Sequence, residues 1–274
     1  KYLGNTQQAY DLLYRATWDY RFSAPGYFHL AQLDCRRGNF SQALQHINRS
    51  LEANQRNYKA HALKSSVLRH LGRDNEAQNI ADKALEKDPL NPWAGFELYL
   101  AEKNIEGETA EEEYKHLNEV LQANKTQSYL DMATNYIKCG LWNDGYQLLS
   151  KYISSENPED PLIYYYMGYI SEHVGETNNS KRYYEKGAAA SPDYCFPFRI
   201  ETLKILNQVI EVQPDDDRAH YYLGNLLYHF KQEDKAIGEW ERAQALNDEY
   251  AYVHRNLGMA NRRVRGNLDK AIRY

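Results

Sequence analysis

Residues 217–250, which read DRAHYYLGNLLYHFKQEDKAIGEWERAQALNDEY, decide the fold predicted for this chain. The pair Leu223 and Gly224 lies early in this stretch, and the small residue Ala236 precedes Trp240 by four positions. Apolar residues that recur every three or four positions are typical of amphipathic helices. Two helices can approach closely where small side chains meet. The stretch therefore predicts two packed helices joined by a turn.

The same pattern recurs along the chain with a period of 34 residues. Gly38, Gly72 and Gly140 are separated by 34 and 68 residues, and Ala43 and Ala77 share the same step. A period of this length indicates a solenoid built from repeated helix pairs. We therefore expect one solenoid over residues 1–274, with the following parts: a partial repeat 1–23, repeats 24–57, 58–91, 92–125, 126–160 and 161–194, an irregular segment 195–216, a repeat 217–250 and a partial repeat 251–274.

The recurring glycines and prolines have physical roles in such repeats. A glycine after the first helix tolerates the positive φ that the turn needs. Proline fits the first turn of a helix but not its interior. The chain has eight prolines, and none is expected inside a helix, because Pro197 lies in the irregular segment and the other seven lie at repeat junctions: Pro25, Pro89, Pro92, Pro158, Pro161, Pro192 and Pro214.

With glycine, alanine and proline at these recurring positions, the sequence resembles the tetratricopeptide repeat family over nearly its whole length. The resemblance implies an all-α fold, a right-handed α-α superhelical solenoid whose first helices line a concave face. The repeat 92–125 departs from the pattern, since Glu106-Gly107 stands at the turn and Glu111 replaces the central alanine.

The segment 191–216 breaks the period. One helix fits there, over about 199–212, and the loop Pro192-Asp193-Tyr194-Cys195-Phe196-Pro197-Phe198 replaces the missing first helix. This loop and the run LDCRRG at 33–38 resemble the repeat region downstream of a DUF5107-type domain in large bacterial proteins. The resemblance implies a bacterial chain whose other domain lies on the N-terminal side. Since the repeat pattern is interrupted at both ends, we expect the sequence to be a fragment of a longer chain.

Composition argues against several classes of function. The net charge of −5 does not suit nucleic-acid binding, which needs a basic surface. No apolar run approaches the 20 or so residues of a membrane span. Three scattered cysteines offer neither a disulfide framework nor a CxxC zinc pair. The N-terminal residues carry no signal peptide, and the sequence gives no localisation beyond a slight preference for the cytoplasm.

No catalytic, metal-binding or cofactor-binding constellation stands out. The HExxH, P-loop and GxGxxG motifs are absent from the sequence. His61, His220 and His254 share the fourth position of their repeats, where packing against the neighbouring helix is the expected role. Cys195 has no neighbouring base in the sequence to activate it. We therefore predict no enzyme activity, no metal and no cofactor.

The concave face is the candidate binding site that the resemblance implies. An aromatic, hydroxyl-rich channel can stack on a bound segment and offer it hydrogen bonds. The alternative is that tyrosine, of which the chain has 25, is a large filler of the repeat packing. Burial of Tyr165, Tyr169 and Tyr221 between helices would refute the groove. The candidate residues are Phe28, Gln32, Arg36, Arg69, Trp93, Phe96, Tyr165, Tyr169, Tyr221, Asn225, Tyr228, Tyr252 and Arg255.

These observations favour a non-catalytic protein–protein interaction scaffold that holds a peptide or partner segment in a Tyr-rich groove. The Lys, Asn and Arg set with which one variant of the family clamps a C-terminal carboxylate is absent, because the fifth positions carry Phe28, Ala62, Phe96, Leu130 and Tyr165. The alternative is the helical scaffold of a larger carbohydrate-related bacterial protein, which packs on its own N-terminal domain or binds glycan. Neither prediction includes nucleic acid or membrane as a partner.

Overall fold

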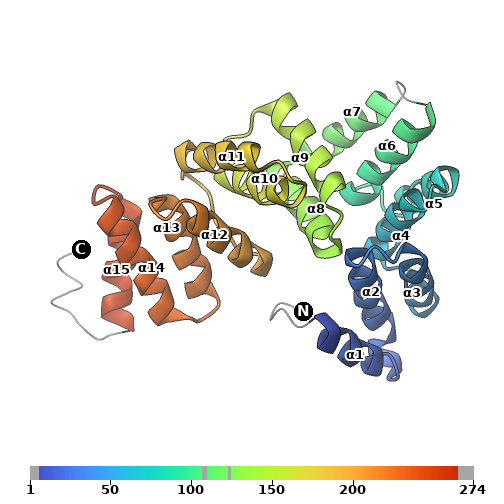
Figure 1. Cartoon of the computed structure of the whole chain (residues 1–274), viewed down its shortest axis with the longest axis horizontal. Helices are drawn as coiled ribbons and strands as arrows, with labels where there is room; N and C mark the ends of the chain where they lie inside the picture. The colour runs from blue at the N-terminus through green and yellow to red at the C-terminus, as the bar shows by residue number, and fades with distance from the viewer. Residues whose placement is uncertain (1–5, 107–109, 123–124, 265–274) are drawn as a thin grey trace. The chain divides into compact units, whose positions relative to one another are not determined.

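The computed structural model describes residues 6–106, 110–122 and 125–264, and every regular element in these ranges is a helix (Figure 1). The all-α fold class predicted from the sequence is confirmed. Gly107 and residues 265–274 were part of the predicted repeat pattern and lie outside the described residues. The helices are α1 (Thr6–Ala16), α2 (Tyr20–Arg36), α3 (Phe40–Ala53), α4 (Tyr58–His70), α5 (Asp74–Lys87), α6 (Pro92–Glu106), α7 (Ala110–Val120), α8 (Lys125–Cys139), α9 (Trp142–Glu156), α10 (Pro161–His173), α11 (Thr177–Ala189), α12 (Ile200–Val212), α13 (Asp217–His229), α14 (Glu233–Leu246) and α15 (Ala251–Arg263).

The chain forms two compact units that divide between Leu148 and Leu149, within α9. We call them the N-terminal and the C-terminal unit. Within each unit, helices that follow one another pack as pairs, such as α2 with α3 and α13 with α14. The predicted single solenoid over residues 1–274 and its repeat boundaries stay predictions.

Glycine closes the turn between the two helices of four pairs. Gly38, Gly72, Gly140 and Gly175 have φ values of 74°, 72°, 69° and 88°. The amide after each of the first two turn glycines bonds back to the last turn of the first helix, as in Asn39 N–H to Asp34 O at 2.9 Å and Arg73 N–H to Leu68 O at 3.0 Å. This is the Schellman arrangement, in which only glycine takes the left-handed conformation without cost.

Small residues let the paired helices approach closely in the C-terminal unit. A Cβ atom added at Gly224 would lie 2.5 Å from Trp240 Nε1, and one added at Gly187 would lie 2.5 Å from Tyr165 Cε1. Each large ring therefore rests on the backbone of the facing helix. Gly224 and Trp240, which the sequence analysis identified in residues 217–250, form one such close crossing.

The prediction that no proline lies inside a helix is wrong for Pro25. Helix α2 begins at Tyr20 instead of near residue 24, because the Asp19 side chain caps it by accepting a hydrogen bond from Arg21 N–H at 3.0 Å. Pro25 is therefore in the second turn of the helix. Since proline has no amide hydrogen, Arg21 O loses its usual bond to residue 25.

The irregular segment has the predicted form. Residues 190–199 are not helical, and the single helix α12 begins at Ile200, one residue after the predicted start. We call residues 192–199 the aromatic loop.

Candidate functional site

The structure buries most of the aromatic rings that the sequence placed in a groove. Tyr165, Tyr169 and Tyr221 are 0%, 1% and 4% exposed, and Trp93 and Phe96 are also buried. The prediction that these five side chains line an accessible groove is therefore wrong.

The tyrosines of the C-terminal unit act as large fillers, and some of them also form hydrogen bonds through the hydroxyl group. Tyr165 rests on Gly187 of the second helix, and its hydroxyl donates to Asp216 Oδ2 at 2.8 Å. Burial, together with the neighbouring Asp216 carboxylate, raises the pKa of Tyr165 well above its usual range, so the hydroxyl remains a donor. The Tyr221 and Tyr250 rings pack with centroids 4.9 Å apart. Tyrosine fills these spaces because it combines a large apolar ring with a polar tip that a buried carboxylate can bind.

The remaining candidates of the C-terminal unit also make intramolecular contacts. Asn225 Oδ1 accepts from Trp240 Nε1 at 3.1 Å and from Asn256 Nδ2 at 2.8 Å. Tyr228 packs on Trp240 with ring centroids 5.4 Å apart, and both Asn225 and Tyr228 are half-buried. The exposed pair Tyr252 and Arg255 lies together, with the guanidinium 5.7 Å from the ring centroid.

Phe28 and Gln32 do come together, in a pocket of the N-terminal unit. The pocket has a volume of about 620 Å³ and lies between α1, α2, α4 and α8. Sequence reasoning missed its other residues, although Lys59 and Lys138 occupy the second and thirteenth positions of their repeats, which the family resemblance directs to the concave face. The pocket is lined by Ala9, Leu12, Leu13, Phe28, His29, Gln32, Lys59, Asn135 and Lys138.

Arg36 helps to form this pocket from outside it. Its Nη2 donates to Ile137 O at 2.7 Å, which ties the end of α2 to α8 across 101 residues of sequence. At Gly140, just after α8, an added Cβ would lie 3.1 Å from Arg36 Cα. Helices far apart in the sequence therefore meet here, and the pocket lies in the space that α1, α2 and α4 leave beside α8.

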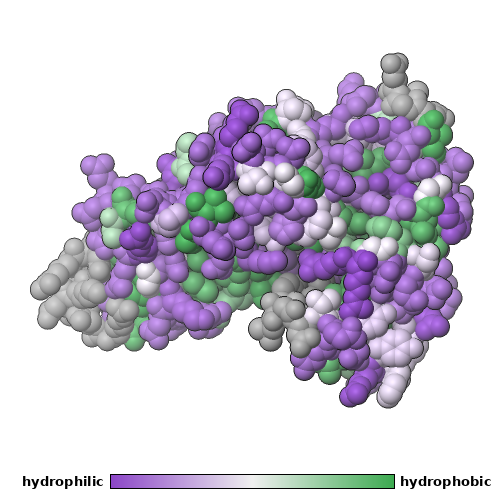
Figure 2. Space-filling view, in the orientation of Figure 1, coloured by the Kyte–Doolittle hydropathy of each residue, from purple (hydrophilic) through white to green (hydrophobic). Residues whose placement is uncertain are grey.

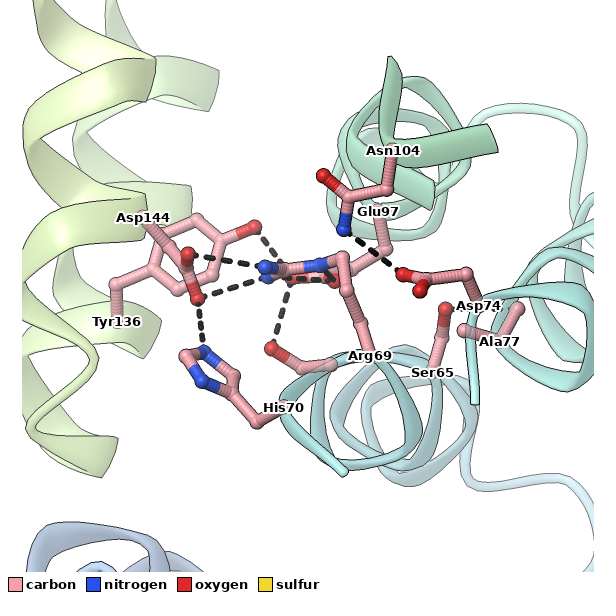
Figure 3. Close-up of polar contacts among 10 residues, drawn as sticks. Ser65, Arg69, His70, Asp74, Ala77, Glu97, Asn104, Tyr136 and Asp144 are labelled. Atoms are coloured by element: carbon pink, nitrogen blue, oxygen red, sulfur yellow. Dashed lines mark hydrogen bonds and ion pairs between the residues drawn. The ribbon is translucent and has the colours of Figure 1, made fainter. Parts of the chain in front are cut away.

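Arg69, another groove candidate, is instead the centre of a buried ion cluster (Figure 3). Its Nε donates to Glu97 Oε2 at 3.2 Å, and its Nη1 and Nη2 donate to the two oxygens of Asp144 at 3.2 and 2.8 Å. Glu97 Oε1 also accepts from Tyr136 OH at 2.6 Å. His70 Nε2 contacts Asp144 Oδ2 at 2.8 Å. The cluster joins α4, α6, α8 and α9 inside the N-terminal unit.

Opposing effects set the pKa values in the cluster. Burial raises the pKa of Glu97, and Arg69 opposes this only in part. For Asp144, burial acts in the same direction, but Arg69 and His70 outweigh it and lower the pKa. Because all three guanidinium nitrogens of Arg69 bond to carboxylates, the predicted role of Arg69 in a binding groove is wrong and its role is structural.

The histidines at the fourth repeat position share one contact. His61 Nε2 lies 2.9 Å from Gln55 O, His220 Nε2 lies 3.1 Å from Pro214 O, and His254 Nε2 lies 2.5 Å from Asp248 O. In each case the carbonyl is six residues earlier, in the segment before the helix. The imidazole therefore ties a first helix to the loop that enters it. In the described ranges, no group of three His, Cys, Asp or Glu side chains could hold a metal ion.

The aromatic loop presents rings on one side only. Tyr194, Phe196 and Phe198 are 92%, 65% and 52% exposed, whereas Cys195 and Pro197 between them are buried. This alternation places three aromatic side chains in solvent. The face of the molecule shown in Figure 2 is largely hydrophilic. Exposed aromatic rings in sequence are a feature of interaction surfaces.

Contacts within the C-terminal unit anchor the aromatic loop. Cys195 Sγ lies 3.8 Å from Asp160 Oδ1, and Asp193 Oδ1 accepts from Tyr252 OH at 3.2 Å. Burial raises the pKa of the Cys195 thiol, which keeps it protonated and poorly nucleophilic. The Arg199 guanidinium stacks over the Phe198 ring at 4.3 Å. These contacts hold the loop against the N-terminal cap of α10 and against α15 of the C-terminal unit.

The chain is similar to known repeat proteins. The family model described as tetratricopeptide repeat matches residues 29–92 and 203–250. A tetratricopeptide repeat protein from Parabacteroides merdae is 15% identical, with 92% of this chain and 99% of that chain covered and a TM-score of 0.35. A thermophilic tetratricopeptide repeat protein from Thermus thermophilus is 13% identical, with 86% and 98% covered and a TM-score of 0.29. MamA is 18% identical, with 77% and 89% covered and a TM-score of 0.29.

The resemblance to the region downstream of a DUF5107-type domain stays a prediction. Among the helices of the described ranges, none combines the length and the apolar character that a membrane crossing needs.

Proposed function

We propose that this chain, with tetratricopeptide repeats in both of its compact units, is a non-catalytic scaffold that binds a segment of a partner protein. Repeats of this family are typical of protein–protein interaction scaffolds. The observation that carries the proposal is the pocket between α1, α2, α4 and α8, where two residues expected on the concave face, Phe28 and Gln32, lie together.

The size and lining of the pocket support binding. Its volume of about 620 Å³ lies in the range of about 300–1,000 Å³ found for ligand pockets. Leu12, Leu13 and Phe28 give it an apolar wall, while Gln32 and Asn135 add amide groups. Apolar walls with a few convergent polar groups are the usual composition of such sites. A partner segment would occupy this pocket and not the tyrosine positions of the C-terminal unit.

The test fills the pocket without disturbing the core. Ala9 lines the pocket on α1 and is half-buried, so Ala9→Trp would occupy the space. Gln8→Trp is the matched control, because Gln8 is its exposed neighbour and does not line the pocket. Peptides are first selected from a displayed random 12-residue library on the full chain, and their affinities are then measured by fluorescence polarisation.

We expect Ala9→Trp to weaken the selected peptides at least about tenfold, which corresponds to about 1.4 kcal/mol, while Gln8→Trp leaves them unchanged. Failure to select any peptide, or equal binding by both variants, would refute the proposal. Circular dichroism confirms that both variants keep their helix content.

A second surface, the aromatic loop, is a candidate contact point for a partner. The specific observation is the outward display of Tyr194, Phe196 and Phe198 on an anchored backbone. A variant with all three replaced by serine keeps the buried contacts of the loop. In affinity capture from a lysate, partners lost with this variant but kept by Ala9→Trp would support the contact. Identical captures would argue against it. The alternative of glycan binding or packing on another domain of the same protein stays a prediction.

A further inference from the structure

Resting on the proposed function, we propose that the pocket of the N-terminal unit selects an acidic, apolar peptide segment. In such a segment a large apolar side chain lies next to an Asp or Glu side chain. The apolar group would contact Leu12, Leu13 and Phe28, and the carboxylate would lie between Lys59 and Lys138. The carboxylate belongs to a side chain within the segment and not to a chain end.

The charge of the pocket is the first argument. Lys59 and Lys138 both line it, and no Asp or Glu is among the lining residues. The chain as a whole carries a net charge of −5, so a carboxylate-free pocket with two lysines differs from the average surface.

Arg36 lies outside the pocket lining and brings a further positive charge to the end of α8. Its guanidinium bonds to Ile137 O, the carbonyl that directly precedes Lys138. A carbonyl oxygen carries no formal charge, so this contact leaves the guanidinium positively charged. The α2 residues that line the pocket are Phe28, His29 and Gln32, none of which carries a carboxylate. His29 Nδ1 contacts Gln32 Oε1 at 3.0 Å. An anionic partner therefore meets a site of complementary charge.

The placement of the lysines is the second argument. Lys59 extends from α4 and Lys138 from α8, so the two ammonium groups approach the pocket from different helices. Lys59 is exposed and, among the described residues, has no ion-pair partner. A lysine ammonium on a four-carbon stem adjusts its position readily, and its hydrogen bonds to a carboxylate are stronger than those between neutral groups.

The apolar side of the pocket selects a second feature of the ligand. Leu12 is 59% exposed and lies beside Leu13 and Ala9 on α1. Covering such surface favours binding of an apolar side chain. A segment with only acidic residues would leave this wall in water. The site therefore requires both features, in neighbouring positions of one segment.

The experiment is a charge reversal with a matched control. The full chain, the Lys59→Glu/Lys138→Glu variant and a Lys87→Glu/Lys115→Glu control are each used to select from the displayed 12-residue library. Lys87 and Lys115 are exposed residues of the N-terminal unit outside the pocket, so the control has the same net charge. The display format fuses the C-terminus of each peptide, and therefore only side-chain carboxylates are presented.

We expect the native chain to enrich peptides with Asp or Glu within two residues of Leu, Phe or Trp. The pocket reversal should weaken these peptides at least about tenfold and should itself select Lys- or Arg-containing peptides, whereas the control should change affinity less than about twofold. Binding by the native chain should also weaken as salt is raised.

The outcomes separate this inference from the proposed function. If peptides are selected without acidic residues, or if the pocket reversal acts no more strongly than the control, the scaffold function stands and this inference is overturned. If the native chain selects no peptide, both fail. Binding of dodecanoate with no peptide selected would likewise overturn the proposal, because it would assign the pocket to a free amphiphilic acid.

Discussion

Replacing Arg69 with methionine should strongly destabilise the N-terminal unit. Arg69 Nη2 lies 3.1 Å from Glu97 Oε2 and 2.8 Å from Asp144 Oδ2, and all three side chains are almost completely buried. Methionine fills most of the space of the arginine stem but leaves two carboxylates without their cation. Removing one partner of a buried ion pair costs about 3–5 kcal/mol. We therefore expect the free energy of unfolding to fall by about this amount at pH 7.

The assay is urea unfolding of the full chain, followed by far-UV circular dichroism. With a slope of about 2 kcal/mol per M of urea, a loss of about 4 kcal/mol lowers the midpoint of the N-terminal transition by about 2 M. The control is the triple variant Arg69→Met/Glu97→Gln/Asp144→Asn, which removes the charges together. It should regain most of the loss, since neutral groups cost less to bury than unpaired charges.

The pH dependence of the free energy of unfolding provides a second test of the cluster. In the native chain the pKa of Asp144 is lowered from 3.8, so its contribution to stability is present above that pH and is lost as pH falls through the folded pKa. Without Arg69, burial raises the pKa of both Asp144 and Glu97. The deficit of Arg69→Met should therefore shrink between pH 7 and pH 5. A deficit below about 1 kcal/mol at pH 7, or a triple variant no more stable than Arg69→Met, would refute this account of the cluster.

Three further predictions follow from single positions. Gly72→Ala should cost about 1–2 kcal/mol, because φ is 72° while nothing lies within 4 Å of the added Cβ; an unchanged melting temperature would contradict the backbone explanation. Gly224→Ala should cost about 1–3 kcal/mol because its Cβ would lie 2.5 Å from Trp240 Nε1, and tryptophan-detected urea unfolding without a lower midpoint would show that the crossing relaxes freely. Burial lowers the pKa of His220, but the hydrogen bonds to Glu239 and to Pro214 O, together with the Glu239 charge, raise it more, so its net shift is upward from 6.5. The contribution of His220 to stability is therefore full below pH 6.5 and is lost as pH rises through the folded pKa. His220→Gln should remove this pH dependence. If the melting temperatures of the native chain and of His220→Gln change equally between pH 6 and pH 8, this role of His220 is wrong.

The helix pairs and their turns could be predicted from the amino-acid sequence. The 34-residue period, the turn glycines such as Gly38 and Gly72, and the single helix of the irregular segment were all readable, because they depend on neighbours within one repeat. Pro25 was the exception, since the capping bond of Asp19 starts α2 earlier than the period suggests.

The side chains that are available to a partner could not be predicted in this way, because their exposure depends on how the helices pack. The contact of Arg69 with Asp144 spans 75 residues of sequence, and that of Arg36 with Ile137 spans 101. The position of Tyr165 in its repeat could be predicted from the sequence. Whether its ring faces solvent depends on packing against Gly187 and on the hydrogen bond to Asp216, which come from other parts of the chain. Local sequence sets backbone conformation through steric and capping effects, whereas burial and charge pairing depend on helices that meet only after the repeats have packed.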